Sequence, residues 1–216
     1  MEKTLKRDKI AYDFIKDRII SGEYSSDYII DERKISKLLD ISTTPVKNAL
    51  KFLEKEQFVT IKPRKKTVVK PITLKLIKDL FQMRTNLEYV LIKLTIINTP
   101  KAILEKELLG FRKNFEELKK QHGFNKTYNA FRFFFAQNCG NKFMSQQMIT
   151  VYEHIYRLRV NLFHNTPRRE LAIDEQIELI DEILKNGDGK RLKKLVDTHI
   201  EKSQIEFFSN LNNLYI

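Results

Sequence analysis

The stretch that decides the fold is Ile41-Ser-Thr-Thr-Pro-Val-Lys-Asn-Ala-Leu50. Ser42 is a favourable helix N-cap, because its hydroxyl can accept a hydrogen bond from a free backbone N–H of the first turn. Pro45 follows early enough to remove no helical hydrogen bond. We therefore predict a helix that begins at about Thr43. Its inward face consists of apolar residues at three- and four-residue spacing, namely Val46, Ala49, Leu50 and Leu53.

The opposite face of this helix is short, polar and cationic. It carries Thr43, Thr44, Lys47, Asn48 and Lys51. Such side chains at the start of a helix can reach base edges and phosphates in the major groove of DNA, as in the second helix of a helix-turn-helix. An ordinary amphipathic surface helix shows the same pattern. The flanking segments therefore decide between the two interpretations.

The upstream segment favours a DNA-binding helix. Asp31 can cap a short helix that carries Ile35, Leu38 and Leu39, and Asp40 ends it just before Ser42. Two helices joined by so tight a turn form a helix-turn-helix.

The downstream segment predicts a wing. Two β-rich runs, at residues 58–61 and 67–69, flank the basic stretch Lys62-Pro-Arg-Lys-Lys66. This pattern indicates a β-hairpin with a basic tip. The candidate DNA contacts at the tip are Arg64, Lys65 and Lys66.

The formal net charge of +12 is unevenly distributed along the 216 residues. Residues 41–70 hold eight Lys or Arg against Glu54 and Glu56, so half of the positive excess falls on the predicted helix and wing. Cations that displace condensed counterions from phosphates are the electrostatic signature of DNA binding. A charged run is more often a solvated face, but this one coincides with the surface that the helix pattern predicts.

From about residue 9 to residue 70 the sequence resembles the N-terminal winged-helix domain of the GntR family of bacterial transcription regulators. The matching residues are Ile20-Ser-Gly22, Ser42, Thr44-Pro-Val46 and Ala49-Leu50. The resemblance implies that the protein binds double-stranded DNA, with contacts from Ser42 onward along the recognition helix.

Three positions depart from the family pattern. Thr43 and Lys47 stand where the family usually has arginine, and Lys66 stands where it has glycine. Arginine can contact guanine with two hydrogen bonds and threonine cannot, so Thr43 is expected to alter the base preference.

The remainder of the N-terminal region completes this domain. A first helix is predicted at residues 9–21, and Met1–Lys6 is expected to be a mobile arm that can add a DNA backbone contact. Residues 1–70 thus form the predicted winged helix-turn-helix domain, and residues 71–73 a linker. The residues of the first helix that should face the core are Ile10, Phe14, Ile15 and Ile19.

Beyond the linker, residues 74–216 show long amphipathic helices. These are expected at about 74–97, 101–121, 125–138, 142–164, 170–186 and 189–209. Short connections favour antiparallel neighbours and hence a six-helix bundle. The predicted fold class is therefore mainly α, with an N-terminal winged helix-turn-helix that has a small β-hairpin wing and a C-terminal all-α six-helix bundle.

The order and spacing of these helices resemble the FCD effector-binding domain of the FadR subfamily within GntR. The matching residues are Arg84 and Glu88, Phe131, Gly140-Asn141, Gly187-Asp188 and His199. The resemblance implies that this domain binds a small-molecule effector and assembles as a two-fold homodimer.

Many members of that subfamily hold a divalent metal through one aspartate and three histidines. The corresponding positions here are Tyr128, Arg132, Ile177 and His199, and a lone imidazole does not make a metal site. The other histidines do not restore it, because they fall in a loop or off the apolar stripe of their helix: His122, His154 and His164. We therefore expect no metal and no cofactor.

Arg132, Arg159 and His199 lie within apolar stripes of the predicted helices. A buried arginine needs an anionic partner, because an unpaired buried charge costs several kcal/mol. Glu88 and Asp174 are candidates within the bundle. The alternative is an organic acid or a phosphate, which arginine holds with two parallel hydrogen bonds, and a protonated His199 would add a further cation. The candidate effector-binding residues are Arg84, Tyr128, Arg132, Arg159 and His199.

These patterns predict a ligand-responsive transcription regulator, with a repressor role expected, whose dimer binds a pseudo-palindromic operator. One alternative is an architectural nucleic-acid-binding protein with an inert bundle. Another is a metabolic enzyme that uses the bundle pocket, although the sequence shows no nucleophile–base pair or phosphate loop. No long apolar run or signal peptide appears, so we expect a cytoplasmic protein without a membrane partner. Cys139, the only cysteine, cannot form an internal disulfide.

Overall fold

The computed structural model of the protein describes residues 2–62, 66–119, 127–162 and 168–214. The chain divides into two compact units, Met1–Leu74 and Lys75–Ile216. The described residues form nine helices and three short strands. The predicted fold class is confirmed, because the first unit is a winged helix-turn-helix and the described elements of the second are all helices.

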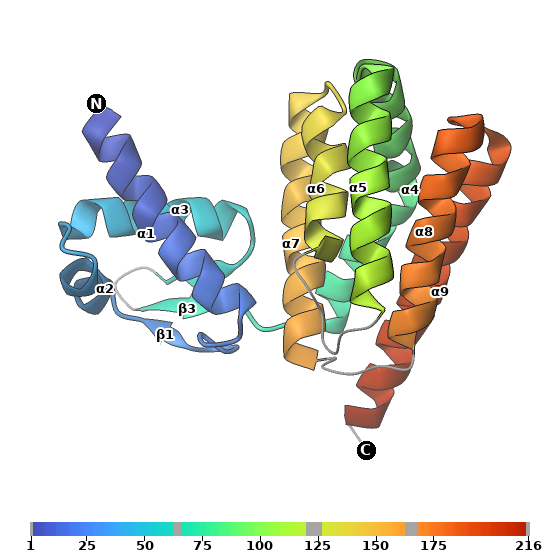
Figure 1. The fold of residues 1–216 in the computed structure, drawn as a ribbon. Helices are drawn as coiled ribbons and strands as arrows, with labels where there is room; N and C mark the ends of the chain where they lie inside the picture. The colour runs from blue at the N-terminus through green and yellow to red at the C-terminus, as the bar shows by residue number, and fades with distance from the viewer. Residues whose placement is uncertain (1, 63–65, 120–126, 163–167, 215–216) are drawn as a thin grey trace. The chain divides into compact units, whose positions relative to one another are not determined.

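The first unit combines three helices with a small antiparallel sheet (Figure 1). Its elements are α1 (Glu2–Ile20), β1 (Ile29–Ile30), α2 (Glu32–Leu38), α3 (Thr43–Lys55), β2 (Val59–Ile61) and β3 (Thr67–Val69). β3 lies between β1 and β2 and pairs antiparallel with both. The hairpin register places Thr60 opposite Val68, which fixes the base of the wing.

The strand β1 is absent from the sequence prediction. Two residues are too few to show the alternation that marks a strand. Ile29 and Ile30 pair with Val68 and Thr67, and the carbonyl of Tyr28 accepts a hydrogen bond from the Val69 N–H at 3.0 Å. β1 therefore pairs with the edge of β3 that the hairpin alone would leave unpaired.

Two expectations about the first helix are wrong. α1 already begins at Glu2, so residues 2–6 are helical and do not form a separate arm. Ile10 is 44% exposed, because the helix meets the core through Ala11, Ile15 and Ile19 at four-residue spacing.

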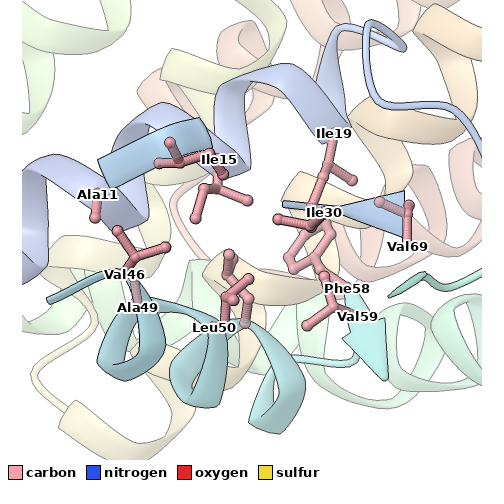
Figure 2. Close-up of a cluster of buried hydrophobic side chains, with 12 residues drawn as sticks. Ala11, Ile15, Ile19, Ile30, Val46, Ala49, Leu50, Phe58, Val59 and Val69 are labelled. Carbon is pink, nitrogen blue, oxygen red and sulfur yellow. The ribbon is translucent and has the colours of Figure 1, made fainter. Parts of the chain in front are cut away.

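The core of the first unit lies between α1, α3 and the sheet (Figure 2). Figure 2 shows the side chains of α1 facing those of α3, with Ile30, Phe58 and Val69 at one side of the cluster. Burial of each large aliphatic side chain contributes roughly 2 kcal/mol. The four inward residues predicted for α3 are all fully buried: Val46, Ala49, Leu50 and Leu53.

The second unit is the predicted six-helix arrangement (Figure 1). Its helices are α4 (Leu74–Asn98), α5 (Lys101–Leu118), α6 (Thr127–Asn138), α7 (Lys142–Leu162), α8 (Arg168–Asn186) and α9 (Lys190–Leu214). Among the described residues, no helix combines the length and apolar content needed to cross a membrane.

Two kinds of contact hold α6 in place inside the bundle. Phe111 and Phe115 of α5 pack edge-to-face against Phe131, each with 5.3 Å between ring centroids. The hydroxyl of Thr95 on α4 donates to the carbonyl of Phe135 at 2.8 Å. The polar residue next to Phe131 in the sequence, Arg132, is thereby fixed inside the bundle, where it is only 3% exposed.

Candidate functional site

The candidate DNA-binding residues on α3 share its outer face. The helix begins at Thr43, as predicted. The exposed members are Ser42, Thr44, Lys47 and Lys51, and the half-buried ones are Thr43 and Asn48. The sequence pattern therefore places these residues together, but with unequal access to a partner.

The turn that presents α3 is held by side-chain hydrogen bonds. Asp31 caps α2 as predicted, since its Oδ1 accepts from the N–H groups of Arg33 and Lys34 at 2.9 and 3.0 Å. The Ser36 hydroxyl then donates to the carbonyl of Ile41 at 2.6 Å, which fixes the chain just before α3.

The N-terminus of α3 differs from the prediction in one respect. Ser42 has the extended backbone expected of an N-cap, but its side chain makes no capping hydrogen bond. The first turn also contains no acidic side chain. Free N–H groups and the helix dipole make such a helix end favourable for a phosphate oxygen.

The base of the wing is tied to α3. Oε1 of Glu54 accepts a hydrogen bond from the Ile61 N–H at 2.7 Å, so α3 and β2 are held together. Lys66, immediately before β3, is exposed. Arg64 and Lys65 lie outside the described residues.

A contact that the sequence pattern does not reveal joins Asn48 to α1. The Asn48 Nδ2 donates to Oδ2 of Asp8 at 3.1 Å. Asp8 is 40 residues away in the chain, so the contact depends on how α1 crosses α3 and not on either helix's own periodicity.

The centre of the bundle contains a buried ion pair on α4. Nε and Nη2 of Arg84 donate to the Glu88 carboxylate at 2.6 and 3.1 Å, and Arg84 is fully buried. Burial alone would lower the pKa of Arg84, but the carboxylate outweighs it and the pKa is raised. Internal pairing is therefore the correct interpretation for this arginine. The prediction that Asp174 pairs with a buried arginine is wrong, because Asp174 is exposed and binds Lys119 at 2.5 Å.

Arg132 of α6 lies near the Arg84–Glu88 pair but is farther from the Glu88 carboxylate than Arg84 is. Its Nε is 4.0 Å from Oε1 of Glu88 and makes no hydrogen bond within the described residues. Its Nη2 lies 3.3 Å from Nε2 of His199 on α9. Burial, together with the positive charge of Arg84, lowers the pKa of Arg132.

His199 is held as a neutral imidazole. Its Nδ1 is 2.7 Å from the Glu175 carboxylate, which requires a proton on Nδ1. Its Nε2 then accepts from Arg132 and from the Gln176 amide at 2.9 Å. Burial lowers the pKa of His199 to about 4, with the nearby arginines adding to the effect. The expectation of a protonated His199 is therefore wrong at neutral pH.

Arg159 of α7 and Tyr128 of α6 complete this centre. The Arg159 and Arg132 guanidinium groups lie 5.2 and 5.6 Å from the Tyr128 ring centroid. Burial, with Arg132 as a second cause, lowers the pKa of Arg159 to about 9, and burial raises the pKa of Tyr128 to about 12. The structure thus gathers all five candidate effector-binding residues: Arg84, Tyr128, Arg132, Arg159 and His199.

The residues at this centre do not fit a divalent metal. The Nε2 of His199 already faces two N–H donors, and one of them belongs to the cationic Arg132. Ile177, at the remaining position, is an apolar side chain. Within the part of the chain that the structure describes, no group of three or more His, Cys, Asp or Glu residues could hold a metal ion.

Several polar residues near the centre are not predicted by the sequence pattern. Glu175 and Gln176 of α8 hold His199, and Arg168 binds Glu175 through two hydrogen bonds at 3.1 and 2.8 Å. A histidine within an apolar stripe indicates that polar side chains contact it inside the bundle, but the sequence pattern does not identify which residues these are. The sequence pattern predicts that His154 lies off the apolar stripe of its helix, yet the residue is only 2% exposed.

A groove between α8 and α9 reaches the same histidine from outside. It has a volume of about 420 Å³. His199 lies in its lining with Glu175, and the basic side chains around it are Arg191, Lys194 and Lys202.

Comparisons with known proteins agree with both units. The sequence model of the bacterial regulatory proteins of the gntR family matches residues 8–69, and the model of the FCD domain matches residues 79–202. The chain is similar to the uncharacterised HTH-type transcriptional regulator YdhC of Bacillus subtilis (strain 168), at 21% identity over 82% of this chain and 80% of that protein.

Two solved structures share the fold. McbR/YncC of E. coli has a TM-score of 0.78 at 14% identity, covering 95% of this chain and 98% of that one. A GntR-type protein of Rhodococcus sp. RHA1 has a TM-score of 0.73 at 15% identity, covering 94% of this chain and 98% of that one. With both family models matched in order along one chain, the protein belongs to the GntR family of transcription regulators and carries a C-terminal FCD effector-binding domain.

Proposed function

We propose that the protein is a homodimeric repressor that binds a pseudo-palindromic operator and senses a small anionic metabolite, an organic acid or a phosphate, at the centre of its helical domain. Ligand binding changes operator affinity, because the ligand binds the two arrangements of the dimer with different affinity.

The N-terminal surface supports DNA binding. Lys47 and Lys51 are exposed on the same face of α3 as Thr44, and Lys66 is exposed at the base of the wing. The uncapped first turn of α3 adds backbone N–H donors at the end of the helix that enters the groove in this fold. Phosphate contacts then set affinity, and the α3 side chains set sequence preference.

The outer face of α4 supports a homodimer. Val90 and Ile97 are 39% and 63% exposed, and Met83, Leu87 and Leu94 are half-buried on the same stripe. Alternating spacings of four and three residues are the pattern of helices that pack lengthwise against a partner helix. A two-fold axis brings this stripe against its own copy and gives two recognition helices for two half-sites.

The single observation that carries the effector proposal is the polar mismatch at the bundle centre. At this centre the buried atoms Arg84 Nη1 and Arg132 Nε have no hydrogen-bond partner within the described residues, and the same holds for Ser203 Oγ, four residues after His199 on α9. Glu88 is already engaged by Arg84, and Arg132 and Arg159 add positive charge beside it. An anion that accepts hydrogen bonds from these groups would satisfy the donors and offset the charge.

Calorimetry tests this proposal. Citrate, malate, glycerol 3-phosphate and glucose 6-phosphate are titrated into the wild type, into Arg132→Met and into the control Arg112→Met. Arg112 lies on α5 and is 39% exposed in an ion pair with Asp181, so the control makes the same substitution outside the centre. We expect at least one anion to bind the wild type and the control equally, and Arg132→Met at least tenfold more weakly. Equal binding to Arg132→Met, or no binding to the wild type, would contradict an anionic effector at this centre and favour an inert bundle.

A further inference from the structure

The amide of Asn48 is held in one orientation by Asp8. An ionised carboxylate can only accept hydrogen bonds, so the group that faces it must be Nδ2 and not Oδ1. The 3.1 Å contact between Asn48 Nδ2 and Asp8 Oδ2 therefore settles which way the amide points. One of the two N–H groups of Asn48 is used in this contact.

The two carboxylate oxygens of Asp8 lie in different surroundings. Oδ2 takes the Asn48 amide, whereas Oδ1 is buried and has no hydrogen-bond partner within the described part of the chain. A carboxylate near a DNA-binding surface opposes phosphate binding, and one with a buried, unsatisfied oxygen is costly to the fold. The contact with the Asn48 amide is therefore the interaction through which Asp8 can act on the surface of α3.

The constraint leaves Asn48 with a defined free edge. With one N–H turned to Asp8, the Oδ1 acceptor and the second N–H donor of the amide are not used in this contact. Asn48 is half-buried next to the exposed Thr44 and Lys47 on the outer face of α3. An acceptor beside a donor is the arrangement with which asparagine binds N6 and N7 of adenine in the major groove.

We propose that Asp8 is a specificity-determining positioning residue, which fixes the Asn48 amide so that α3 selects adenine at one position of each half-site. This inference rests on the proposed binding of an operator by α3. Without Asp8 the amide can rotate by half a turn, and the exchanged donor and acceptor then fit other base edges.

Binding-site selection from a randomised duplex pool tests the inference. The proteins are the wild type, Asp8→Asn, Asn48→Ala and the control Asp13→Asn. Asp13 lies on the same helix and is exposed in a pair with Lys9, so its variant makes the same change of charge away from α3. Asp8→Asn is isosteric but can donate as well as accept, so it permits both orientations of Asn48. Circular dichroism melting checks that each variant folds.

We expect the wild type and Asp13→Asn to select the same motif, with adenine at one position of each half-site. Asp8→Asn and Asn48→Ala should both relax that position, with discrimination there reduced about tenfold and the other positions unchanged. At the same time Asp8→Asn should bind random DNA no more weakly than the wild type, because it removes a negative charge. An unchanged motif for Asp8→Asn, or relaxation at a position that Asn48→Ala leaves intact, would overturn the inference. If the wild type selects no motif at all, the proposed operator binding fails instead.

Discussion

Glu175 and His199 form a carboxylate–imidazole pair with 2.7 Å between Oε2 and Nδ1. The pair fixes the tautomer, so that Nε2 is an acceptor turned toward Arg132. In a metal-binding domain this arrangement would make Nε2 a ligand, but here a guanidinium occupies the position that a metal would need. The histidine therefore orients an arginine.

The first prediction follows from the pKa of His199. The usual histidine pKa is 6.5, and burial lowers it to about 4 in the folded protein. Between these values the unfolded chain binds more protons than the folded one, so the free energy of unfolding falls as the pH drops from 6.5 to 4. The loss from this residue amounts to ~3 kcal/mol. The pKa of Glu175 is held at about 2, so its contribution is lost only at still lower pH, from about 4.5 downward.

Urea unfolding of the wild type and of His199→Gln at pH 7, 5.5 and 4.5 checks this prediction. The variant lacks the titrating group, so its stability should fall less between pH 7 and 4.5 than that of the wild type. Parallel pH profiles would show that His199 is not held neutral in the folded protein.

The second prediction concerns the salt dependence of DNA binding. In the proposed dimer on DNA, Lys47→Ala would remove one phosphate contact from each copy of α3, so the slope of log K against log salt should become shallower by roughly two. Lys113→Ala, on α5 in the other unit and 79% exposed, removes the same charge and serves as the control. Fluorescence anisotropy across a salt series measures both slopes. If the two variants change the slope equally, Lys47 contributes only through the net charge of the protein and not through a phosphate contact.

The third prediction concerns assembly. Val90→Asp with Ile97→Asp places two carboxylates on the apolar stripe of α4 and should convert the proposed dimer to a monomer, because like charges would then face each other across its two-fold axis. Light scattering measures the mass. The control is Leu171→Asp on α8, which is 60% exposed and lies off the stripe. A double variant that remains dimeric would exclude α4 as the interface.

The sequence could predict what is encoded within a single element. The inward residues of α3 and the six helices of the bundle follow from apolar spacing, which is a local property. β1 could not be predicted, because its two residues acquire strand structure only by pairing with β3. The burial of His154 has a related cause: α7 is covered on several sides, so its buried residues are not confined to one apolar stripe.

The partners of the candidate site residues depend on how helices cross. Tyr128, Arg132, Arg159 and His199 could be chosen as polar residues within apolar stripes. Their partners could not, because no periodicity relates Glu175 and Gln176 to His199, or Asp8 to Asn48. Asp174 shows the same limit, since its sequence position suits a buried arginine but its side chain binds Lys119 at the surface.

The most direct measurement is the operator affinity of the wild type and of Arg132→Met, by fluorescence anisotropy, with and without a saturating amount of the tightest-binding anion. We expect the anion to change the operator affinity of the wild type by at least about fivefold and to leave that of Arg132→Met unchanged. An unchanged wild-type affinity, or an equal change in Arg132→Met, would contradict the claim that an anion at Arg132 controls DNA binding.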